Sequence, residues 1–371
     1  HSNHRYNTAD YLNVDPLLGT NEDFETLCKE AAKYGIGIVL DGVFSHTGSD
    51  SRYFNREGRY GEGGAYRDPN SPYRSWYDFD PKYKGGYRSW WGFETLPEVN
   101  EETPSFVEFI TGKGGVIDTW LRRGAAGFRL DVADELPDAF IEKIRAAVKR
   151  VSPEKFLLGE VWEDATTKYG FGHRRTYLLG KGLDSVMNYP FKNAVLDFVK
   201  GKPAEQAAGE ILSICEHYPA PALNTALNFL STHDTERALT VIADEPANGR
   251  GREWQSGRNV SGEAYEEGML RLRMAYAIIY TLPGLPCLYY GDEIGMQGYR
   301  DPFNRGYYCW DSHEERLKPV LAQLAHLRHS CEAFRTGALR VLRAEGGVLH
   351  YQRVGATETA EIIVNRSEHI I

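Results

Sequence analysis

Six short apolar runs alternate with segments of helical periodicity along the 371-residue chain, and this rhythm constrains the fold more than any other feature. A chain that alternates strands with helices favours a parallel sheet whose connections are crossover helices. The strands are predicted near Ile38, Leu130, Leu158, Val186, Phe229 and Leu288. The sequence therefore predicts an α/β fold.

Each apolar run ends in a polar residue, so the polar residues share one position in the repeating unit. In an α/β barrel, the carboxyl ends of the strands form the face that carries the active site. The residues at these ends are Asp41, Asp131, Glu160, Asn188, Asp234 and Asp292. We therefore expect the functional carboxylates to be among them.

One of these ends, the segment Gly127–Glu135 with the sequence GFRLDVADE, combines a buried-strand pattern with two full charges. A strand projects residues i and i+2 to the same face, so Arg129 and Asp131 are predicted to lie side by side. Burying such charges is costly unless they are paired or used. From this segment alone, a structural ion pair and a functional site are equal alternatives.

Two stretches interrupt the rhythm. Residues 47–100 are far longer than an ordinary loop, and their aromatic side chains argue against disorder. Beyond Ala333, alternating polar and apolar residues with turn residues predict the start of an all-β domain. The predicted parts are residues 1–46 (first part of the barrel), 47–100 (inserted small domain), 101–333 (second part of the barrel) and 334–371 (start of a C-terminal β-domain).

Composition argues against several classes of function. A formal net charge of −9 argues against nucleic-acid binding, which needs a basic face. No segment approaches about eighteen uninterrupted apolar residues, so we predict no membrane span. The five cysteines are scattered, odd in number and without a C-x-x-C pair, which predicts free thiols and a cytoplasmic location.

Taken together and in this order, the strand-end segments resemble the motifs of the α-amylase superfamily of retaining α-glucan-active enzymes. The segments are DGVFSH (Asp41–His46), GFRLDVADE, GEVW (Gly159–Trp162) and STHDT (Ser231–Thr235). LPEVN (Leu96–Asn100) is similar to a further motif at the end of that family's inserted domain. VMNYPF (Val186–Phe191) most resembles the neopullulanase and cyclomaltodextrinase branch.

The resemblance implies a (β/α)8 TIM barrel with a small domain inserted after the third strand. It also implies three catalytic carboxyl groups: Asp131 as nucleophile, Glu160 as general acid and then base, and Asp234 as stabiliser of the transition state. Retaining hydrolysis needs two carboxyl groups about 5–5.5 Å apart, one nucleophilic and one acidic. Arg129 would then keep the Asp131 nucleophile ionised, which favours the functional alternative for this charged pair.

The resemblance further implies a set of substrate-binding residues. Tyr6 would stack on the reacting sugar, because sugar rings present an apolar face that suits an aromatic platform. His46 and His233 would donate to sugar hydroxyls, and Asp41 would hold Arg129. Trp162 would partly desolvate the acid, and Trp90 and Trp91 could line the cleft. The remaining predicted binding residues are Glu135, Asp301 and Arg305, with His4 and Asp134 as lesser candidates.

Ser45 departs from the family pattern, in which an asparagine at this position often ligates a structural calcium. A serine hydroxyl is a poorer calcium ligand than an amide or carboxylate oxygen. We therefore predict that no cofactor is required and that the usual calcium site is missing. A calcium site elsewhere in the insertion stays possible, with Asp50, Asp68, Asp78 and Asp80 available.

The resemblance favours a hydrolase of starch-type α-glucans, maltooligosaccharides, pullulan or cyclodextrins. The alternatives are a transglycosylase with the same residues and, more remotely, a non-catalytic amylase-like module. The expected partners are the glucan substrate and, in a homodimer, a second copy of the chain. Because only six of eight barrel strands are found and HSNHRYNTADY resembles the loop after the second strand, we expect that preceding residues complete the enzyme.

Overall fold

The computed structural model describes residues 2, 4–312 and 314–367. The chain divides into two compact units, one formed by His1–Val161 with Ala165–Val186 and the other by Trp162–Asp164 with Met187–Ile371. The first is called unit 1 and the second unit 2. Within the described residues, every helix is too short or too polar to cross a lipid bilayer.

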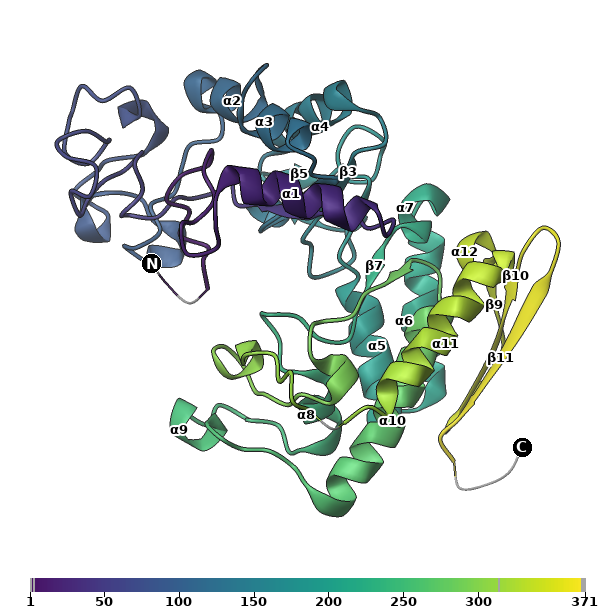
Figure 1. Cartoon of the computed structure of the whole chain (residues 1–371). Coiled ribbons are helices and arrows are strands. Elements are labelled where there is room, and N and C mark those ends of the chain that lie inside the picture. Colours follow the sequence, from purple (N-terminus) through teal and green to yellow (C-terminus); the bar gives the residue numbers. More distant parts are fainter. Residues whose placement is uncertain (1, 3, 313, 368–371) are drawn as a thin grey trace. The chain divides into compact units, whose positions relative to one another are not determined.

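Unit 1 is built on a four-stranded parallel sheet with the strand order β1-β2-β3-β6 (Figure 1). The strands are β1 (Val39–Gly42), β2 (Gly127–Leu130), β3 (Phe156–Gly159) and β6 (Ser185–Val186). All four residues of β2 are buried, as expected for a strand covered on both faces. These strands confirm the first four predicted from the sequence.

The helices of unit 1 follow the predicted periodicity. They are α1 (Asn21–Ala32), α2 (Pro104–Thr111), α3 (Val116–Arg122), η4 (Ala133–Glu135) and α4 (Asp138–Val151). Helix α1 starts with a capping box between Thr20 and Asp23 and is followed by Gly35 at a φ of 71°, a conformation that favours glycine. Helices α2, α3 and α4 pack against one another, and a short hairpin, β4 (Tyr169–Gly170) with β5 (His173–Arg174), follows β3.

Residues 47–100 fold around an aromatic core rather than around regular elements. Their only helical turns in the described chain are η1 (Arg74–Trp76), η2 (Lys84–Gly86) and η3 (Trp90–Gly92). Phe54 and Tyr87 are fully buried, and their ring centroids lie 4.6 Å apart. The prediction of an ordered segment is therefore confirmed, while its independence as a domain stays a prediction.

Unit 2 is mainly helical around a parallel pair of strands, β7 (Leu227–Asn228) and β8 (Leu285–Pro286). Met187, directly after β6, forms a parallel bridge to Leu227, so strands five and six also follow the predicted order. The helices are α5 (Tyr189–Lys200), α6 (Ala204–His217), α7 (Ala220–Asn224), α8 (Ala238–Ala243), α9 (Arg252–Gln255), α10 (Gly262–Thr281), η5 (Asp292–Ile294), η6 (Phe303–Arg305), α11 (Leu317–Ser330) and α12 (Glu332–Thr336).

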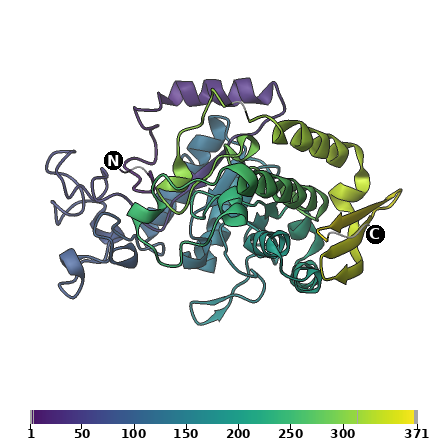
Figure 2. The same cartoon turned by 90° about the horizontal axis from the view of Figure 1, so that it is seen from below.

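The chain's last elements form an antiparallel sheet with the order β11-β10-β9. Its strands are β9 (Ala338–Glu345), β10 (Val348–Val354) and β11 (Thr359–Asn365), drawn in yellow beside α12 in Figure 2. The fully buried Arg353 donates from β10 to the carbonyl oxygens of Thr281 and Gly337. The predicted change to β structure after residue 333 is confirmed.

Candidate active site

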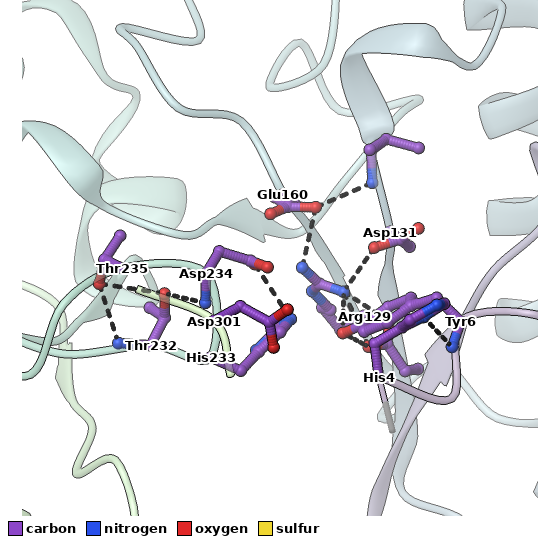
Figure 3. A network of polar contacts seen from close by, with 12 residues as sticks. His4, Tyr6, Arg129, Asp131, Glu160, Thr232, His233, Asp234, Thr235 and Asp301 are labelled. Carbon is purple, nitrogen blue, oxygen red and sulfur yellow. Dashed lines mark hydrogen bonds and ion pairs between the residues drawn. The ribbon is translucent and has the colours of Figure 1, made fainter. Parts of the chain in front are cut away.

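The charged pair at the end of β2 belongs to a larger cluster in unit 1, centred on the guanidinium of Arg129 (Figure 3). Arg129 Nη1 lies 2.7 Å from Asp41 Oδ2 and 3.0 Å from Asp131 Oδ1. Arg129 Nη2 makes an ion pair of 2.8 Å with Glu160 Oε2, although without hydrogen-bond geometry. One cation therefore joins three carboxylates that the sequence separates by up to 119 residues.

The sheet register explains why these residues meet. Asp41 on β1 is the direct partner of Arg129 on β2, and Asp131 follows on the same face. The ladder continues beyond the strands, because the Asp131 amide donates to Gly42 O and the Glu160 amide donates to Leu130 O. Parallel strands thus bring their carboxyl ends to one edge, as predicted.

Burial dominates the electrostatics of this cluster. Burial raises the pKa of Asp131, the Arg129 guanidinium lowers it, and the carboxylates of Asp41 and Glu160 raise it, so that together they bring it to about 8. We expected Arg129 to keep Asp131 ionised, but its single charge is shared among three carboxylates. The charge state of Asp131 therefore depends on how burial and its three charged neighbours balance.

Tyr6 and His46 adjoin the cluster from two other segments of unit 1. The Tyr6 hydroxyl donates to Asp41 Oδ2 at 2.9 Å and accepts from Arg129 at 3.3 Å. Burial raises the pKa of Tyr6 well above its usual value, so its hydroxyl stays protonated. The structure thus brings both predicted binding residues to the charged cluster.

Both ring nitrogens of His46 form hydrogen bonds within the protein. Its Nε2 lies 3.0 Å from the Tyr6 carbonyl oxygen, which can only accept, so Nε2 carries the hydrogen. Its Nδ1 then accepts from the Ser45 hydroxyl at 2.9 Å, and burial lowers the pKa of His46 to about 4. His46 thus holds the backbone beside Tyr6, and its predicted donation to a sugar hydroxyl stays a prediction.

Glu135 sits in η4, four residues after Asp131, and its carboxylate accepts hydrogen bonds from two indoles. Trp90 Nε1 donates to Glu135 Oε2 at 2.6 Å, and Trp91 Nε1 donates to Glu135 Oε1 at 2.9 Å. The neighbouring Asp134 accepts from Tyr177 and pairs with Lys168, contacts typical of a structural role. Sequence reasoning named Glu135 and both tryptophans without linking them, because 44 residues separate Trp91 from Glu135.

A second polar cluster lies in unit 2 and contains the third predicted carboxylate. Asp234 pairs with His233 at 3.0 Å and with Arg305 at 3.5 Å, and Arg305 also pairs with Asp301 at 2.8 Å. The structure brings these four predicted residues together through contacts within unit 2. Of the predicted catalytic residues, Asp131 and Glu160 therefore belong to unit 1 and Asp234 to unit 2.

Asn304 is a positioning residue that sequence reasoning missed. Its side chain is fully buried and donates to the carbonyl oxygens of His233 and Thr235, at 2.7 Å and 2.8 Å. It thereby fixes the loop that carries Asp234. The only available signal was its place beside Arg305 in the segment RDPFNR.

Two other predicted strand-end residues and Trp162 make contacts within unit 2. Asp292 is buried, accepts a hydrogen bond from Tyr276 at 2.7 Å and pairs with Arg237, and burial raises its pKa to about 6.

Asn188 caps α5, and its side-chain amide donates a hydrogen bond to the Asn228 side chain. Trp162 stacks on Tyr189, with centroids 4.2 Å apart. Asp292 and Asn188 therefore have structural roles, and the predicted effect of Trp162 on Glu160 stays a prediction.

The residues considered for calcium have protein partners. Ser45 Oγ is bonded to His46, Asp50 pairs with Arg59, and Asp80 pairs with Lys82. In the part of the chain that the structure describes, no three His, Cys, Asp or Glu side chains are grouped to hold a metal ion. The predicted absence of the usual calcium site therefore stays a prediction.

Comparison with known proteins places these motifs in one family. The family model described as "Alpha amylase, catalytic domain" matches residues 1–336. An amylopullulanase of Thermoanaerobacter thermohydrosulfuricus is 35% identical over 390 residues, covering 95% of this chain and 25% of that protein. A cyclomaltodextrinase of Geobacillus thermopakistaniensis is 31% identical over 378 residues, covering 99% of this chain and 57% of that protein. The chain thus spans between a quarter and three fifths of the length of these two curated relatives.

A solved structure agrees with this assignment. The ligand-free cyclic α-maltosyl-(1→6)-maltose hydrolase of Arthrobacter globiformis superposes with a TM-score of 0.83 at 29% identity, covering 99% of this chain and 76% of that one. The match extends to the α/β barrel fold and to the β structure that follows it. The chain therefore belongs to the α-amylase family, in its neopullulanase- and cyclomaltodextrinase-like branch.

Proposed function

We propose that this chain carries the catalytic machinery of a retaining hydrolase of α-glucans, such as maltooligosaccharides, pullulan or cyclodextrins. The observation that supports it best is the contact of one guanidinium, that of Arg129, with both Asp131 and Glu160. Two carboxyl groups that share one guanidinium are close neighbours, as the separation of about 5–5.5 Å in retaining glycosidases requires. Relatives named amylopullulanase and cyclomaltodextrinase support the substrate class.

In the proposed reaction, ionised Asp131 attacks the anomeric carbon while protonated Glu160 gives its proton to the leaving glycosidic oxygen. A covalent glucosyl ester on Asp131 results. Glu160, now ionised, removes a proton from water, whose oxygen attacks the anomeric carbon on the face opposite Asp131 and breaks the bond between that carbon and the Asp131 oxygen. Asp234 has the predicted role of stabilising the positive charge that develops on the sugar. Tyr6, held by Asp41, offers an aromatic surface to the reacting ring.

Product analysis with the full-length protein tests this proposal. We expect hydrolysis of maltoheptaose, pullulan or a cyclodextrin to release the α-anomer first, because two displacements restore the starting configuration. Proton nuclear magnetic resonance during the first turnovers distinguishes the anomers before they equilibrate. A β-anomer appearing first would exclude the mechanism, and no hydrolysis of any of the three glucans would exclude the function.

We also propose that no calcium ion joins residues 47–100 to the sheet beside His46. The Ser45 hydroxyl, already bonded to His46, is a weak ligand for a hard cation. We expect the melting temperature to shift by less than about 2 °C when a chelator is added, since a ligand that is not bound contributes no stability. A larger fall in melting temperature, which added calcium reverses in the wild type but not in Ser45→Ala, would contradict the proposed absence of calcium at this position.

A cytoplasmic location and a homodimer complete the proposal. All five cysteines are free thiols, although only Cys309 is exposed, and free thiols suit a reducing compartment. Assembly into a homodimer rests on the family resemblance alone. Gel filtration of the full-length protein with light scattering would measure its mass directly.

A further inference from the structure

Val132 directly follows the candidate nucleophile Asp131, and its backbone has an unusual conformation. Its φ of 40° and ψ of 49° lie in the left-handed region, which a β-branched residue rarely adopts because its side chain crowds the backbone. Such a conformation persists only where the surrounding structure imposes it, and these conformations are concentrated at functional sites. The turn after Asp131 is therefore strained at Val132.

The strained conformation directs the Val132 amide toward the candidate general acid. The Val132 N–H donates to Glu160 Oε2 at 2.9 Å, and Arg129 Nη2 makes its ion pair with the same oxygen. Glu160 is only 4% exposed, so both contacts act where the dielectric constant is low and electrostatic interactions are strong. Because the carbonyl oxygen of a carboxyl group is its better acceptor, two cationic or N–H partners on Oε2 favour the acidic proton on Oε1. The Val132 amide thus helps to orient the proton of Glu160.

Arg175, directly after β5, holds the same turn from its other end. Its Nη1 donates to the carbonyl oxygen of Asp134 at 2.7 Å, and its Nη2 donates to the carbonyl oxygen of Leu136 at 2.5 Å. Its Nε donates to the carboxylate of Asp138 at 2.9 Å. All three guanidinium nitrogens therefore bind one short stretch of chain, which begins two residues after Val132.

The guanidinium of Arg175 is enclosed by the fold. Its side chain is fully buried, and its guanidinium carbon lies 4.4 Å from the ring centroid of Tyr177 and 5.1 Å from that of Phe171. Tyr177 in turn donates to Asp134 Oδ1 at 2.9 Å. Burying a cation is costly unless its donors are paired, and the partners of Arg175 are mostly backbone carbonyl oxygens. Its contacts therefore fix the path of the backbone after Asp131.

The strained turn is held on both sides by separate contacts. On the upstream side, the Asp131 amide continues the β2 ladder by donating to Gly42 O. On the downstream side, the Glu135 amide donates to Val132 O at 2.8 Å, and Arg175 holds the carbonyl groups before and after Glu135. With both sides fixed, Val132 cannot relax to an ordinary φ without breaking one of these hydrogen bonds.

We infer that Arg175 is a positioning residue for the general acid, because it keeps Val132 in the left-handed conformation that bonds the Val132 amide to Glu160. All three residues belong to unit 1. The inference rests on the proposed function and deepens it, since it adds a buried residue that acts on Glu160 only through the backbone. Loss of the Arg175 contacts releases Val132, and the proton of Glu160 then no longer points toward the leaving glycosidic oxygen.

The dependence of the rate on the leaving group tests this inference in the full-length protein. We expect Arg175→Lys to lower kcat/KM for maltoheptaose about 30-fold, because lysine cannot hold three acceptors in one plane and a general acid contributes about 10²- to 10⁴-fold. The same variant should keep kcat/KM for α-maltotriosyl fluoride within about twofold of the wild type, because fluoride departs without receiving a proton. Equal losses on both substrates, or no loss on maltoheptaose, overturn the inference.

A second substitution tests the route through Val132. Glycine adopts the left-handed conformation without strain, so Val132→Gly should raise the maltoheptaose activity of Arg175→Lys by at least about fivefold. No recovery in this double variant overturns the inference. The matched control is Arg174→Lys, the same change at the exposed neighbouring position of the hairpin, which should keep both values of kcat/KM.

Tyr177→Phe replaces Arg175→Lys if that variant shows no cooperative melting transition. It removes only the hydroxyl that binds Asp134, so it should lower kcat/KM for maltoheptaose about threefold and leave that for α-maltotriosyl fluoride unchanged. Equal effects on the two substrates overturn the inference alone. A wild-type protein that hydrolyses neither substrate overturns the proposed function, and the inference with it.

Discussion

Replacing Asp131 with asparagine is expected to lower kcat by at least about a thousandfold while leaving maltoheptaose binding largely intact, because the amide cannot form the glucosyl ester. The side chain keeps its size, and Arg129 keeps Asp41 and Glu160 as partners. The measurement is steady-state hydrolysis of maltoheptaose together with calorimetric binding to the variant.

The control for this variant is Asp197→Asn, which removes a surface carboxylate that pairs with Lys202 on unit 2. It should keep wild-type activity. Asp131→Asn should also melt at a temperature no lower than the wild type near pH 7, because burial already disfavours the charged form of Asp131. More than a tenth of wild-type activity in a correctly folded Asp131→Asn protein would show that Asp131 is not the nucleophile.

Removing the charge of Arg129 should move the acidic limb of the pH profile of kcat/KM to higher pH. Asp131 must be ionised to attack, and Arg129 lowers its pKa against the effects of burial, Asp41 and Glu160. An opposite charge at this distance is worth about 1–3 pKa units, so Arg129→Gln should shift the limb upward by that amount. At pH values below this limb, each pKa unit of displacement lowers kcat/KM tenfold. The value of kcat/KM at pH 7 should therefore fall by about 10- to 1000-fold.

Arg129→Lys separates charge from geometry in this experiment. Lysine keeps the positive charge but lacks the planar guanidinium that contacts three carboxylates. The acidic limb of Arg129→Lys should therefore lie between the limbs of the wild type and Arg129→Gln. The measurement is kcat/KM from pH 4 to pH 10 at constant ionic strength. Equal losses at every pH, with no displacement of the limb, would show that Arg129 acts on structure alone.

Much of the fold could be predicted because its signals are local. Strand positions follow from apolar runs, and the helical periodicity of segments such as Asp138–Val151 follows from contacts three and four residues apart. The side-by-side placement of Arg129 and Asp131 also follows from strand geometry alone, and the structure confirms it at 3.0 Å. The predicted change to β structure after residue 333 has the same local origin.

The charge state of the cluster could not be predicted in this way, because it depends on how many groups share one cation. Sequence reasoning paired Arg129 with Asp131, but Asp41 and Glu160 also reach the guanidinium across neighbouring strands. Desolvation then depends on everything packed around Asp131, and its balance with the neighbouring charges raises the pKa of Asp131 to about 8. These effects depend on groups that are close in space but come from several segments, so no single segment of the sequence predicts them.

The sequence by itself therefore determined which residue types stand at the strand ends, since period and polarity are encoded within a few residues. Only the tertiary structure decided what those residues do for one another. It engaged the N–H of His46 with Tyr6, and it placed the buried Asn304 behind the Asp234 loop. It also joined Glu135 to two indoles from a distant segment. Hydrogen-bond partners are chosen by proximity in space, and folding brings together groups whose separation along the chain carries no pattern.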